Sequence, residues 1–385
     1  MERLLKIVEI RGFDLSFPLE EKMGNALNLF AKRDAFLLQI VTDEGTVGWG
    51  EAGNSPRAAS ALIRTRFASN LLGKSPLDFG RHHQVLSNML GYDRRGAAMM
   101  ALSAVDIATH ELAAKAYGIS VAKLLGGAVR DSVFAYASGP YLREGSAPYA
   151  SYGADVESYL KKGFKAIKPR AGFDPKADGL MANALRKLVG NNVAIMVDMN
   201  QSYTAHAAIE SARRMQEADL LWIEEPVQPE DIVGYQTFAR SVPIAIAGGE
   251  ALAGVGAFRD FLTAGTFSIL QPDLSICGGY TTLRQIAALG KAFELPVMPH
   301  VFGTVVNFLA TLQVAATLEP RRGGGPAVYP YVEFDMMNNP LMTLNGEIPV
   351  SSDSTIEVPD IPGTGLDLSP EKLAPWLVGS WTERL

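Results

Sequence analysis

The stretch NNVAIMVDMNQ (residues 191–201) is followed by two similar apolar runs, ADLLWIEEP (218–226) and VPIAIAGGE (242–250). The apolar part of each run ends in an acid, and these acids are Asp198, Glu224 and Glu250. They are evenly spaced, 26 residues apart. That period suits one strand, one loop and one helix, so the pattern predicts repeated βα units.

Apolar runs of this length are typical of strands buried on both faces of a parallel sheet. A polar residue at the carboxyl end of such a strand lies at the rim where barrel enzymes hold their active sites. Three carboxylates there would repel one another unless a cation lay between them, and ligation by oxygen alone favours Mg²⁺. The alternative is that the acids are helix N-caps or solvated loop residues. The equal spacing favours a site for one Mg²⁺ formed by Asp198, Glu224 and Glu250.

From residue 132 onward, apolar runs alternate with helical patterns. The runs are VFAYASG (133–139), KAIKPR (165–170), VAIMVDMN (193–200), LLWIEEP (220–226), PIAIAGGE (243–250), FSILQPD (267–273), LPVMPH (295–300) and YPYVEF (329–334). The helix candidates between them include 176–189, 205–217, 254–264 and 279–293. Eight strands separated by helices predict an α/β protein with a (β/α)8 barrel. A doubly wound open sheet is the second interpretation, but it would not place polar residues at nearly every strand end.

The first 130 residues follow a different pattern. Residues 1–50 alternate polar and apolar positions and predict an antiparallel meander with a turn at residues 43–45, interrupted by an irregular polar segment at 18–32. Residues 55–125 have helical period, and the helix at 97–118 is expected to stop near Gly118. We therefore predict an N-terminal α+β capping domain, residues 1–130, completed by the turn-rich segment 340–385. The barrel is predicted to span 131–339.

Composition excludes several classes of function. The chain has 385 residues, 48% of them hydrophobic, and a net charge of −6, which gives no support to a nucleic-acid or anionic-membrane partner. No apolar run reaches the length of a membrane span, and the charged start MERLLKIVEI does not resemble a secretory signal. The single cysteine, Cys277, excludes an internal disulfide and fits a reducing cytoplasm.

Other strand ends carry groups suited to acid–base chemistry. Lys168 and Arg170 are two residues apart and so share one side of a strand. Asp273 and His300 end successive runs, and Asp273 is positioned to orient one ring nitrogen of His300. Both features have a simpler interpretation. Lys168 and Arg170 could be solvated cations after a short strand, and His300 could be a structural histidine. Glu333 lies near the end of the last run, where a rim salt bridge is an equal alternative.

These residues together support removal of a proton from the α-carbon of a carboxylic acid. The reaction builds a dianion, which a divalent cation and a nearby lysine offset where the charge develops. The base needs a conjugate acid with a pKa near neutrality, which histidine provides without large perturbation. Active sites of the enolase type use a lysine or histidine base together with Mg²⁺ in this way.

The set resembles the enolase superfamily, specifically its mandelate racemase subgroup, over essentially the whole chain. SAVDIATHELAAKAYGISVAKLLGG (103–127) is similar to the family's helix and domain junction. The resemblance identifies the three acids as metal ligands, Asp273 and His300 as the catalytic dyad, and Glu333 as an acid that contacts substrate. It also implies two loops closing over the barrel, at about 16–32 and 51–57, and a homo-oligomer. The muconate-lactonising subgroup is disfavoured, because its sixth-strand lysine is missing from QPDLSICGG (271–279).

One departure from the family pattern bears on the reaction. The second strand usually carries Lys-x-Lys, with the second lysine as a base, but this chain has Lys168-Pro169-Arg170. Arginine stays protonated, so it is a poor base and a good anion clamp. A racemase transfers protons on both faces of the α-carbon, so Arg170 argues against one. The sequence therefore favours a Mg²⁺-dependent dehydratase that converts a sugar acid to a 2-keto-3-deoxy acid with His300 alone.

A racemase or epimerase of a 2-hydroxy acid is the alternative, and a barrel that binds metal and acid without catalysis is a lesser one. Tyr141 is a candidate second acid. The candidate substrate contacts are Asn200, Tyr141, Lys22, Asn54 and Arg57.

Overall fold

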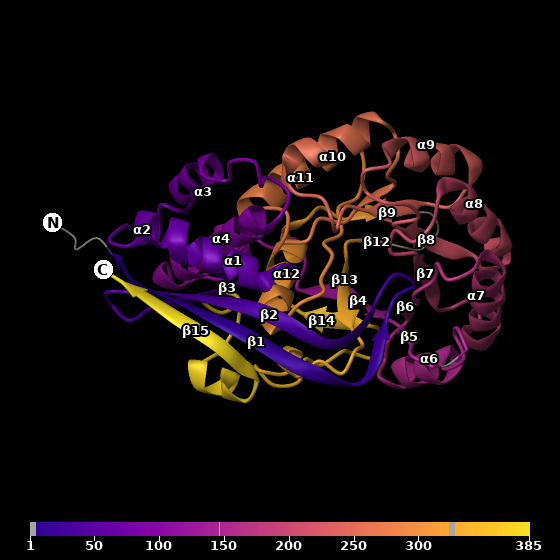
Figure 1. The fold of residues 1–385 in the computed structure, drawn as a ribbon, viewed down its shortest axis with the longest axis horizontal. Helices are drawn as coiled ribbons and strands as arrows, with labels where there is room; N and C mark the ends of the chain where they lie inside the picture. Colours follow the sequence, from indigo (N-terminus) through magenta and orange to yellow (C-terminus); the bar gives the residue numbers. More distant parts are fainter. Residues whose placement is uncertain (1–4, 146, 323–327) are drawn as a thin grey trace.

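The computed structural model describes residues 5–145, 147–322 and 328–385. Its first sheet is antiparallel, and the C-terminal strand lies at its edge beside the first strand (Figure 1). The order is β15 (Leu377–Arg384), β1 (Ile7–Gly24), β2 (Leu29–Thr42) and β3 (Val47–Ala52), and β5 (Leu142–Arg143) also pairs with β1. The predicted turn at 43–45 joins β2 to β3, with Gly45 at φ 80°.

Helices cover this sheet as the helical period predicted. They are α1 (Pro56–Leu62), a π-helical turn (Ile63–Phe67), α2 (Ala68–Leu71), α3 (Phe79–Asn88), α4 (Ala97–Ala116) and α5 (Val121–Leu124). α4 is buried along nearly its whole length, and its backbone lies directly on β3. A Cβ on Gly50 would come 2.0 Å from the carbonyl oxygen of Ala104, so only glycine allows this close approach.

The second sheet is the predicted barrel. Its parallel strands follow the order β10 (Ile269–Leu270), β9 (Ile246–Gly248), β8 (Leu220–Glu224), β7 (Ala194–Asp198), β6 (Ala166–Lys168), β4 (Ser132–Ser138) and β13 (Tyr331–Asp335). The predicted seventh strand joins through two parallel bridges, Leu270 with Val297 and Asp273 with His300. All eight predicted runs therefore lie in the barrel, and the (β/α)8 prediction is confirmed.

Helices between the strands surround the barrel; the first five lie along its outer curve, and the last two lie on the side of the first sheet and its helices (Figure 1). They are α6 (Tyr152–Lys161), α7 (Pro175–Val189), α8 (Ala205–Arg214), α9 (Ile232–Ser241), α10 (Gly254–Thr263), α11 (Gly279–Ala292) and α12 (Val305–Thr317). Short 3₁₀ turns lie at Gln216–Ala218, Pro340–Met342 and Pro370–Trp376, and β11 (Arg321–Arg322) pairs antiparallel with β12 (Val328–Tyr329). In the described ranges no helix has the length and apolar character needed to cross a bilayer.

Apolar side chains fill the barrel interior one layer below the strand ends. This layer contains Tyr136, Ala166, Met196, Trp222, Ala247, Ile269, Met298, Tyr329 and Tyr331. Successive side chains in a strand point to opposite faces, so residues two positions later share the same interior face. Met196 is followed in this way by Asp198, Trp222 by Glu224, and Met298 by His300. The interior therefore changes from apolar to polar toward the carboxyl ends of the strands.

The segment at 18–32, predicted to be an irregular loop, is instead the arm of a long hairpin. β1 continues to Gly24 and β2 begins at Leu29, with Pro18 opposite Lys32 and Met23 opposite Phe30. The alternation that marks a half-buried strand is missing here, because much of this arm is exposed. Pairing with β5 holds it in place, with Met23 opposite Arg143. The loop expected at 51–57 is also shorter, since only residues 53–55 lie between β3 and α1.

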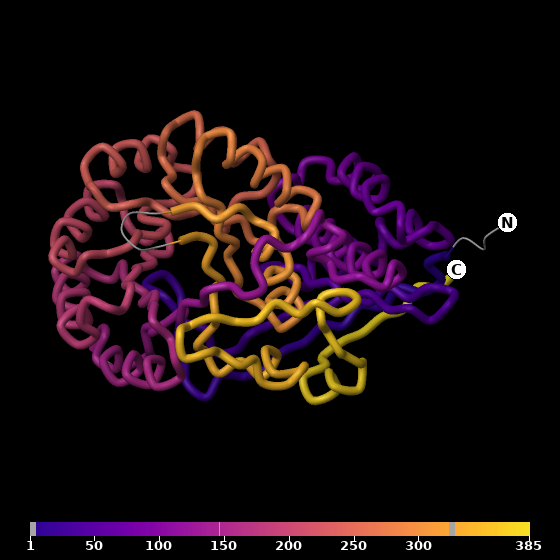
Figure 2. The backbone as a smooth tube through the Cα atoms, turned by 180° about the vertical axis from the view of Figure 1, so that it is seen from behind, coloured from indigo at the N-terminus to yellow at the C-terminus, as the bar shows by residue number. Residues whose placement is uncertain are grey.

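The C-terminal segment 340–385 contacts both sheets. β14 (Thr355–Glu357) pairs with the barrel strand β4, and β15 then pairs with β1. In Figure 2 the yellow tube of this segment runs along one side of the barrel before it reaches the first sheet. The pairing of β15 with β1 agrees with the prediction that residues 340–385 return to the first domain. The domain boundaries at residues 130 and 339 stay predictions.

Candidate active site

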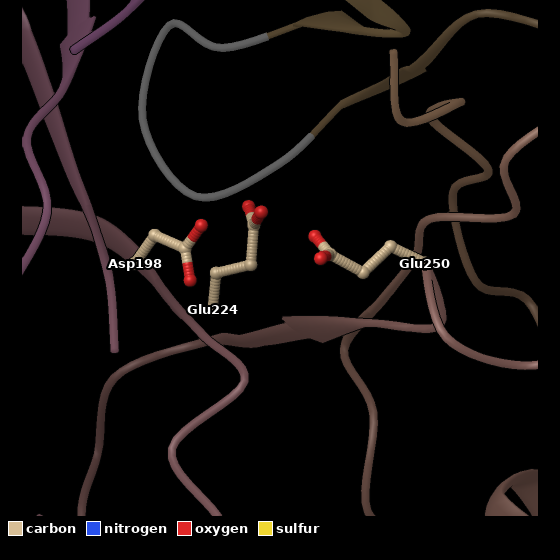
Figure 3. Close-up of side chains that lie close together, drawn as sticks. All are labelled: Asp198, Glu224 and Glu250. Carbon is tan, nitrogen blue, oxygen red and sulfur yellow. The ribbon is translucent and has the colours of Figure 1, made fainter. Parts of the chain in front are cut away.

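The three evenly spaced acids meet at the carboxyl ends of neighbouring strands. Asp198 ends β7, Glu224 ends β8 directly opposite it, and Glu250 follows β9 by two residues. One carboxylate oxygen from each lies within 4.8 Å of the others, and their carboxylates point toward a common space (Figure 3). Asp198 and Glu224 are buried and Glu250 is partly buried. These three residues are called the acidic triad below.

Glu250 reaches the triad through a change in backbone direction. The interior residue of β9 is Ala247, so simple alternation would turn residue 249 inward and residue 250 outward. Gly249 adopts φ 123°, which a side chain would strain, and its Cβ would also come 2.6 Å from the Phe258 ring. Glycine at this position allows Glu250 to turn into the barrel.

Two cations from β6 and the residues after it lie against the triad. Lys168 forms an ion pair with Glu224 and lies 3.0 Å from Glu333 Oε1 and 3.8 Å from Asp198 Oδ2. Burial alone lowers the pKa of Lys168, but the carboxylates of Glu224 and Glu333 outweigh it and raise that pKa above its ordinary value. Arg170 pairs with Asp198 and donates to Ser138 Oγ at 3.2 Å. The predicted sharing of one face by Lys168 and Arg170 is therefore observed.

Asp273 and His300 form a hydrogen-bonded pair. His300 Nδ1 lies 2.7 Å from Asp273 Oδ2, while Nε2 lies 3.3 Å from Glu250 Oε2 and 3.6 Å from Glu333 Oε2. Burial lowers the pKa of His300, but Glu250, Glu333 and Asp273 outweigh it and raise that pKa to about 10. One ring nitrogen is thus fixed by Asp273, and the other faces the acids at the centre of the barrel.

Glu333 on β13 completes the ring of polar residues. Its Oε1 accepts a hydrogen bond from Ser138 Oγ at 2.5 Å, and its Oε2 accepts one from the Val301 amide at 3.3 Å. Burial raises the pKa of Glu333, but Lys168 and then His300 outweigh it and lower that pKa well below its ordinary value. Glu333 is therefore a buried anion in contact with Lys168 and His300.

The predicted substrate contacts divide into two groups. Tyr141 is buried, donates to Asp335 Oδ1 at 3.0 Å, and its ring lies 5.1 Å from the Arg170 guanidinium carbon. Asn200 Nδ2 donates to Asp198 Oδ2 at 2.9 Å. The other three stay predictions: Asn54 and Arg57 are exposed, and Lys22 pairs with Glu144 at 2.7 Å near the tip of the hairpin. The structure thus brings together Tyr141, Asn200 and all eight predicted catalytic and metal-binding residues.

Some residues in contact with the site were not predicted. Ser138 ends β4 and bonds Glu333, and Gln271 Nε2 donates to Glu224 Oε2 at 2.7 Å. Glu225 is buried beside the triad and accepts a hydrogen bond from Gln201 Nε2 at 2.6 Å. A signal was present for two of them, since Ser138 and Gln271 follow the interior residues Tyr136 and Ile269 by two positions.

Comparison with known protein families supports the same interpretation of the fold. The family model described as "Enolase C-terminal domain-like" matches residues 151–372. The model described as "Mandelate racemase / muconate lactonizing enzyme, N-terminal domain" matches residues 19–126. The chain belongs to the enolase superfamily, in its mandelate racemase subgroup.

Relatives within this superfamily include enzymes that act on sugar acids. The D-galactarolactone cycloisomerase of Agrobacterium fabrum is 33% identical over 371 residues, covering 96% of this chain and 98% of the relative. The D-gluconate dehydratase of Thermoproteus tenax is 29% identical over 86% of this chain and 67% of the relative. A racemase from Streptomyces coelicolor, solved with bound magnesium, has a TM-score of 0.86 and 28% identity, covering 97% of this chain and 100% of that chain.

Proposed function

We propose that this chain is a Mg²⁺-dependent lyase that dehydrates a polyhydroxy sugar acid to a 2-keto-3-deoxy acid. The orientation of His300 carries the proposal, because Asp273 holds its Nδ1 while its Nε2 faces the centre of the barrel. In the described part of the chain His300 is the one imidazole at this site. The remaining histidines lie on helices, and these are His82 and His83 on α3, His110 on α4 and His206 on α8.

The acidic triad fits a divalent cation. All three donors are carboxylate oxygens, as hard cations prefer, and they converge within 4.8 Å. The buried Oδ1 of Asn200, next to Asp198, has no hydrogen-bond partner among the described residues. When bound there, Mg²⁺ supplies positive charge that offsets the triad and the charge developing on the substrate carboxylate.

Each of these residues then has a separate role in the elimination of water from the substrate. Positive charge held at the triad would offset Glu250, the acid that raises the pKa of His300 most, so that the imidazole is neutral and can act as a base. His300 Nε2 then takes the proton from the α-carbon, and the electron pair of that C–H bond forms the double bond to the β-carbon. The β-carbon–oxygen bond breaks, and the hydroxyl leaves as water with the proton that His300 returns. The enol product rearranges to the keto acid. Lys168 and Arg170 remain protonated and keep positive charge beside the substrate carboxylate.

Cycloisomerisation is a second candidate, favoured by the 33% identity to D-galactarolactone cycloisomerase over nearly the whole of both chains. It begins with the same removal of the α-proton. The leaving group is then a ring oxygen, so the ring opens and no water is released. The same arrangement of His300 and the triad supports both reactions.

Racemisation is the weaker alternative, although a structural relative is named a racemase. Inversion at the α-carbon needs a proton donor on the face opposite the base. Arg170 occupies the second-strand position where a base would be needed, and a guanidinium does not give up its proton at physiological pH. A non-catalytic barrel would bind metal and acid without exchanging the α-proton.

The test is a screen of open-chain sugar acids, lactones and anhydro sugar acids with Mg²⁺, run in D₂O and in H₂O. A dehydratase gives a semicarbazide-reactive keto acid that is one water lighter than its substrate, whereas a cycloisomerase gives an isomer of equal mass. A racemase returns substrate with an inverted, deuterated α-carbon and no keto acid. Recovery of every substrate without α-proton exchange would favour the non-catalytic barrel.

A further inference from the structure

Glu51 belongs to β3 of the first sheet, yet its side chain is buried against the barrel with 2% exposure. Its carboxylate accepts hydrogen bonds from Thr304 and Asn307, at the start of α12. The Thr304 amide lies 2.9 Å from Oε1, the Thr304 hydroxyl 2.6 Å from Oε2, and the Asn307 amide 3.0 Å from Oε2. Glu51 thus satisfies amides that a helix N-terminus leaves without partners.

This contact suits an anion. The N-terminus of a helix carries partial positive charge, which favours a carboxylate beside it. The chain before α12 also leaves space for the carboxylate, because a Cβ on Gly303 would come 2.4 Å from Glu51 Oε1. The end of β3 and the start of α12 are therefore fitted to one another around a single side chain.

The contact of Glu51 with Thr304 and Asn307 is linked to the Asp273–His300 dyad in two ways. Thr304 follows His300 by four residues, so its anchoring limits the segment on which the imidazole is carried. Asn307 Nδ2 donates to Asp273 Oδ1 at 3.4 Å, and Asp273 Oδ2 holds His300. Glu51 is thus connected to the His300 imidazole through Asn307 and Asp273.

The end of β3 also contacts the loop that carries Asp273, through Ser275. Asp273 Oδ1 accepts from the Ser275 amide at 2.7 Å and from the Ser275 hydroxyl at 2.6 Å. The Ser275 carbonyl in turn accepts from the Gly53 amide at 3.2 Å. Gly53 follows Glu51 by two residues, so one strand end contacts both loops that carry the dyad.

We propose that Glu51 is a positioning residue for the Asp273–His300 dyad, fixing the start of α12 so that the imidazole stays directed at the acidic triad. The proposal rests on the proposed function only in taking these two residues as the proton-transfer pair. It places a required part of the site in the first sheet, outside the barrel.

The test compares Glu51→Gln with a matched control, Glu111→Gln. Glu111 on α4 is also buried and accepts from the Trp49 amide at 2.6 Å and the Thr364 hydroxyl at 3.0 Å, but these partners lie on β3 and the C-terminal segment. The side-chain amide of Gln has nearly the same shape as the carboxylate, but its NH₂ group is a hydrogen-bond donor. In Glu51→Gln this group would face the donors of Thr304 and Asn307, which would lose an acceptor. Thr304→Val breaks the hydroxyl contact while leaving Glu51 unchanged, and it serves if Glu51→Gln does not fold.

The first readout is NMR of protein carrying ¹⁵N in its histidine rings, recorded above pH 7 so that Glu51 is ionised. The His300 signals are assigned by their loss in His300→Asn. We expect these signals to shift in Glu51→Gln and Thr304→Val and to keep their wild-type positions in Glu111→Gln. Unchanged His300 signals in the two test variants would overturn the proposal, as would an equal shift in the control. This readout needs no substrate, so it remains decisive if no sugar acid is turned over.

The second readout is kinetic and applies once a substrate is known. A displaced catalytic group lowers turnover, so kcat is expected to fall about 100-fold in Glu51→Gln, with KM and Mg²⁺ affinity within about twofold of wild type. Glu111→Gln is expected to keep its kcat. Equal losses of kcat in the two variants at equal losses of stability would mean that Glu51 only stabilises the fold.

Discussion

Arg33 on β2 forms an ion pair with Asp335 at the end of β13, 302 residues further along the chain. The Arg33 guanidinium also lies over the Phe302 ring, 3.8 Å from its centroid. The other Asp335 oxygen accepts a hydrogen bond from the Tyr141 hydroxyl. The hairpin arm is thus fixed to the rim of the barrel by a charged contact that is almost fully buried.

Replacing Arg33 by Met should destabilise the protein by about 3–5 kcal/mol, because Asp335 would remain buried without its charged partner. The free energy of unfolding in urea measures this change. Lys22→Met is the control, since the Lys22–Glu144 pair is exposed and such pairs contribute less than about 1 kcal/mol. Equal losses in the two variants would show that the Arg33–Asp335 contact does not anchor the hairpin.

Mg²⁺ should stabilise the folded chain, because a ligand that binds only the folded state lowers its free energy. At a free Mg²⁺ concentration 100 times Kd, the gain is about 2.7 kcal/mol. Thermal unfolding in EDTA and in increasing Mg²⁺ measures it without any substrate. Asp198→Asn should remove most of the shift, and a shift that persists in this variant would place the ion elsewhere.

Stability should also vary with pH through Glu51. Burial raises the pKa of Glu51 from 4.5 to about 7, because it outweighs the hydrogen bonds from Thr304 and Asn307, which favour the carboxylate form. Between these values the folded chain therefore binds a proton that the unfolded chain has released. The resulting stabilisation is fully present below pH 4.5 and is lost as pH rises through about 7, a change of roughly 3 kcal/mol.

The measurement is urea unfolding of wild type and Glu51→Gln from pH 5 to 8, in EDTA so that metal binding does not vary. The stability of wild type relative to the variant should decrease as pH rises. Asp273, whose charge contributes to the raised pKa, is present in both proteins. A difference that stays constant with pH would contradict the assignment.

The sequence predicted the barrel and the central acids because both depend on local pattern. Alternation places Asp198 two residues after Met196 and Glu224 two residues after Trp222, so an apolar interior residue precedes each of these two acids on the same face. Glu250 departs from the alternation and turns inward through Gly249. The equal spacing then brings the acids to one end of the barrel. No long-range information was needed for either step.

Features that depend on contacts between distant segments were missed. The hairpin arm at 18–32 is fixed by β5 and by Arg33–Asp335, and neither contact leaves a local periodic signal. Lys22 stays a predicted substrate contact, and in the structure it pairs with Glu144. Glu51 was not singled out for a similar reason, since the partners of its carboxylate lie more than 250 residues away.

The central claim is that His300 removes the α-proton of an acid bound at the triad, and one measurement tests it most directly. Keto-acid formation from the best substrate of the screen is compared for wild type, His300→Asn and the exposed control His206→Asn, all with Mg²⁺. We expect His300→Asn to lose at least about 10³-fold in kcat while keeping Mg²⁺ affinity, and His206→Asn to match wild type. Keto-acid formation by His300→Asn at the wild-type rate would contradict the account.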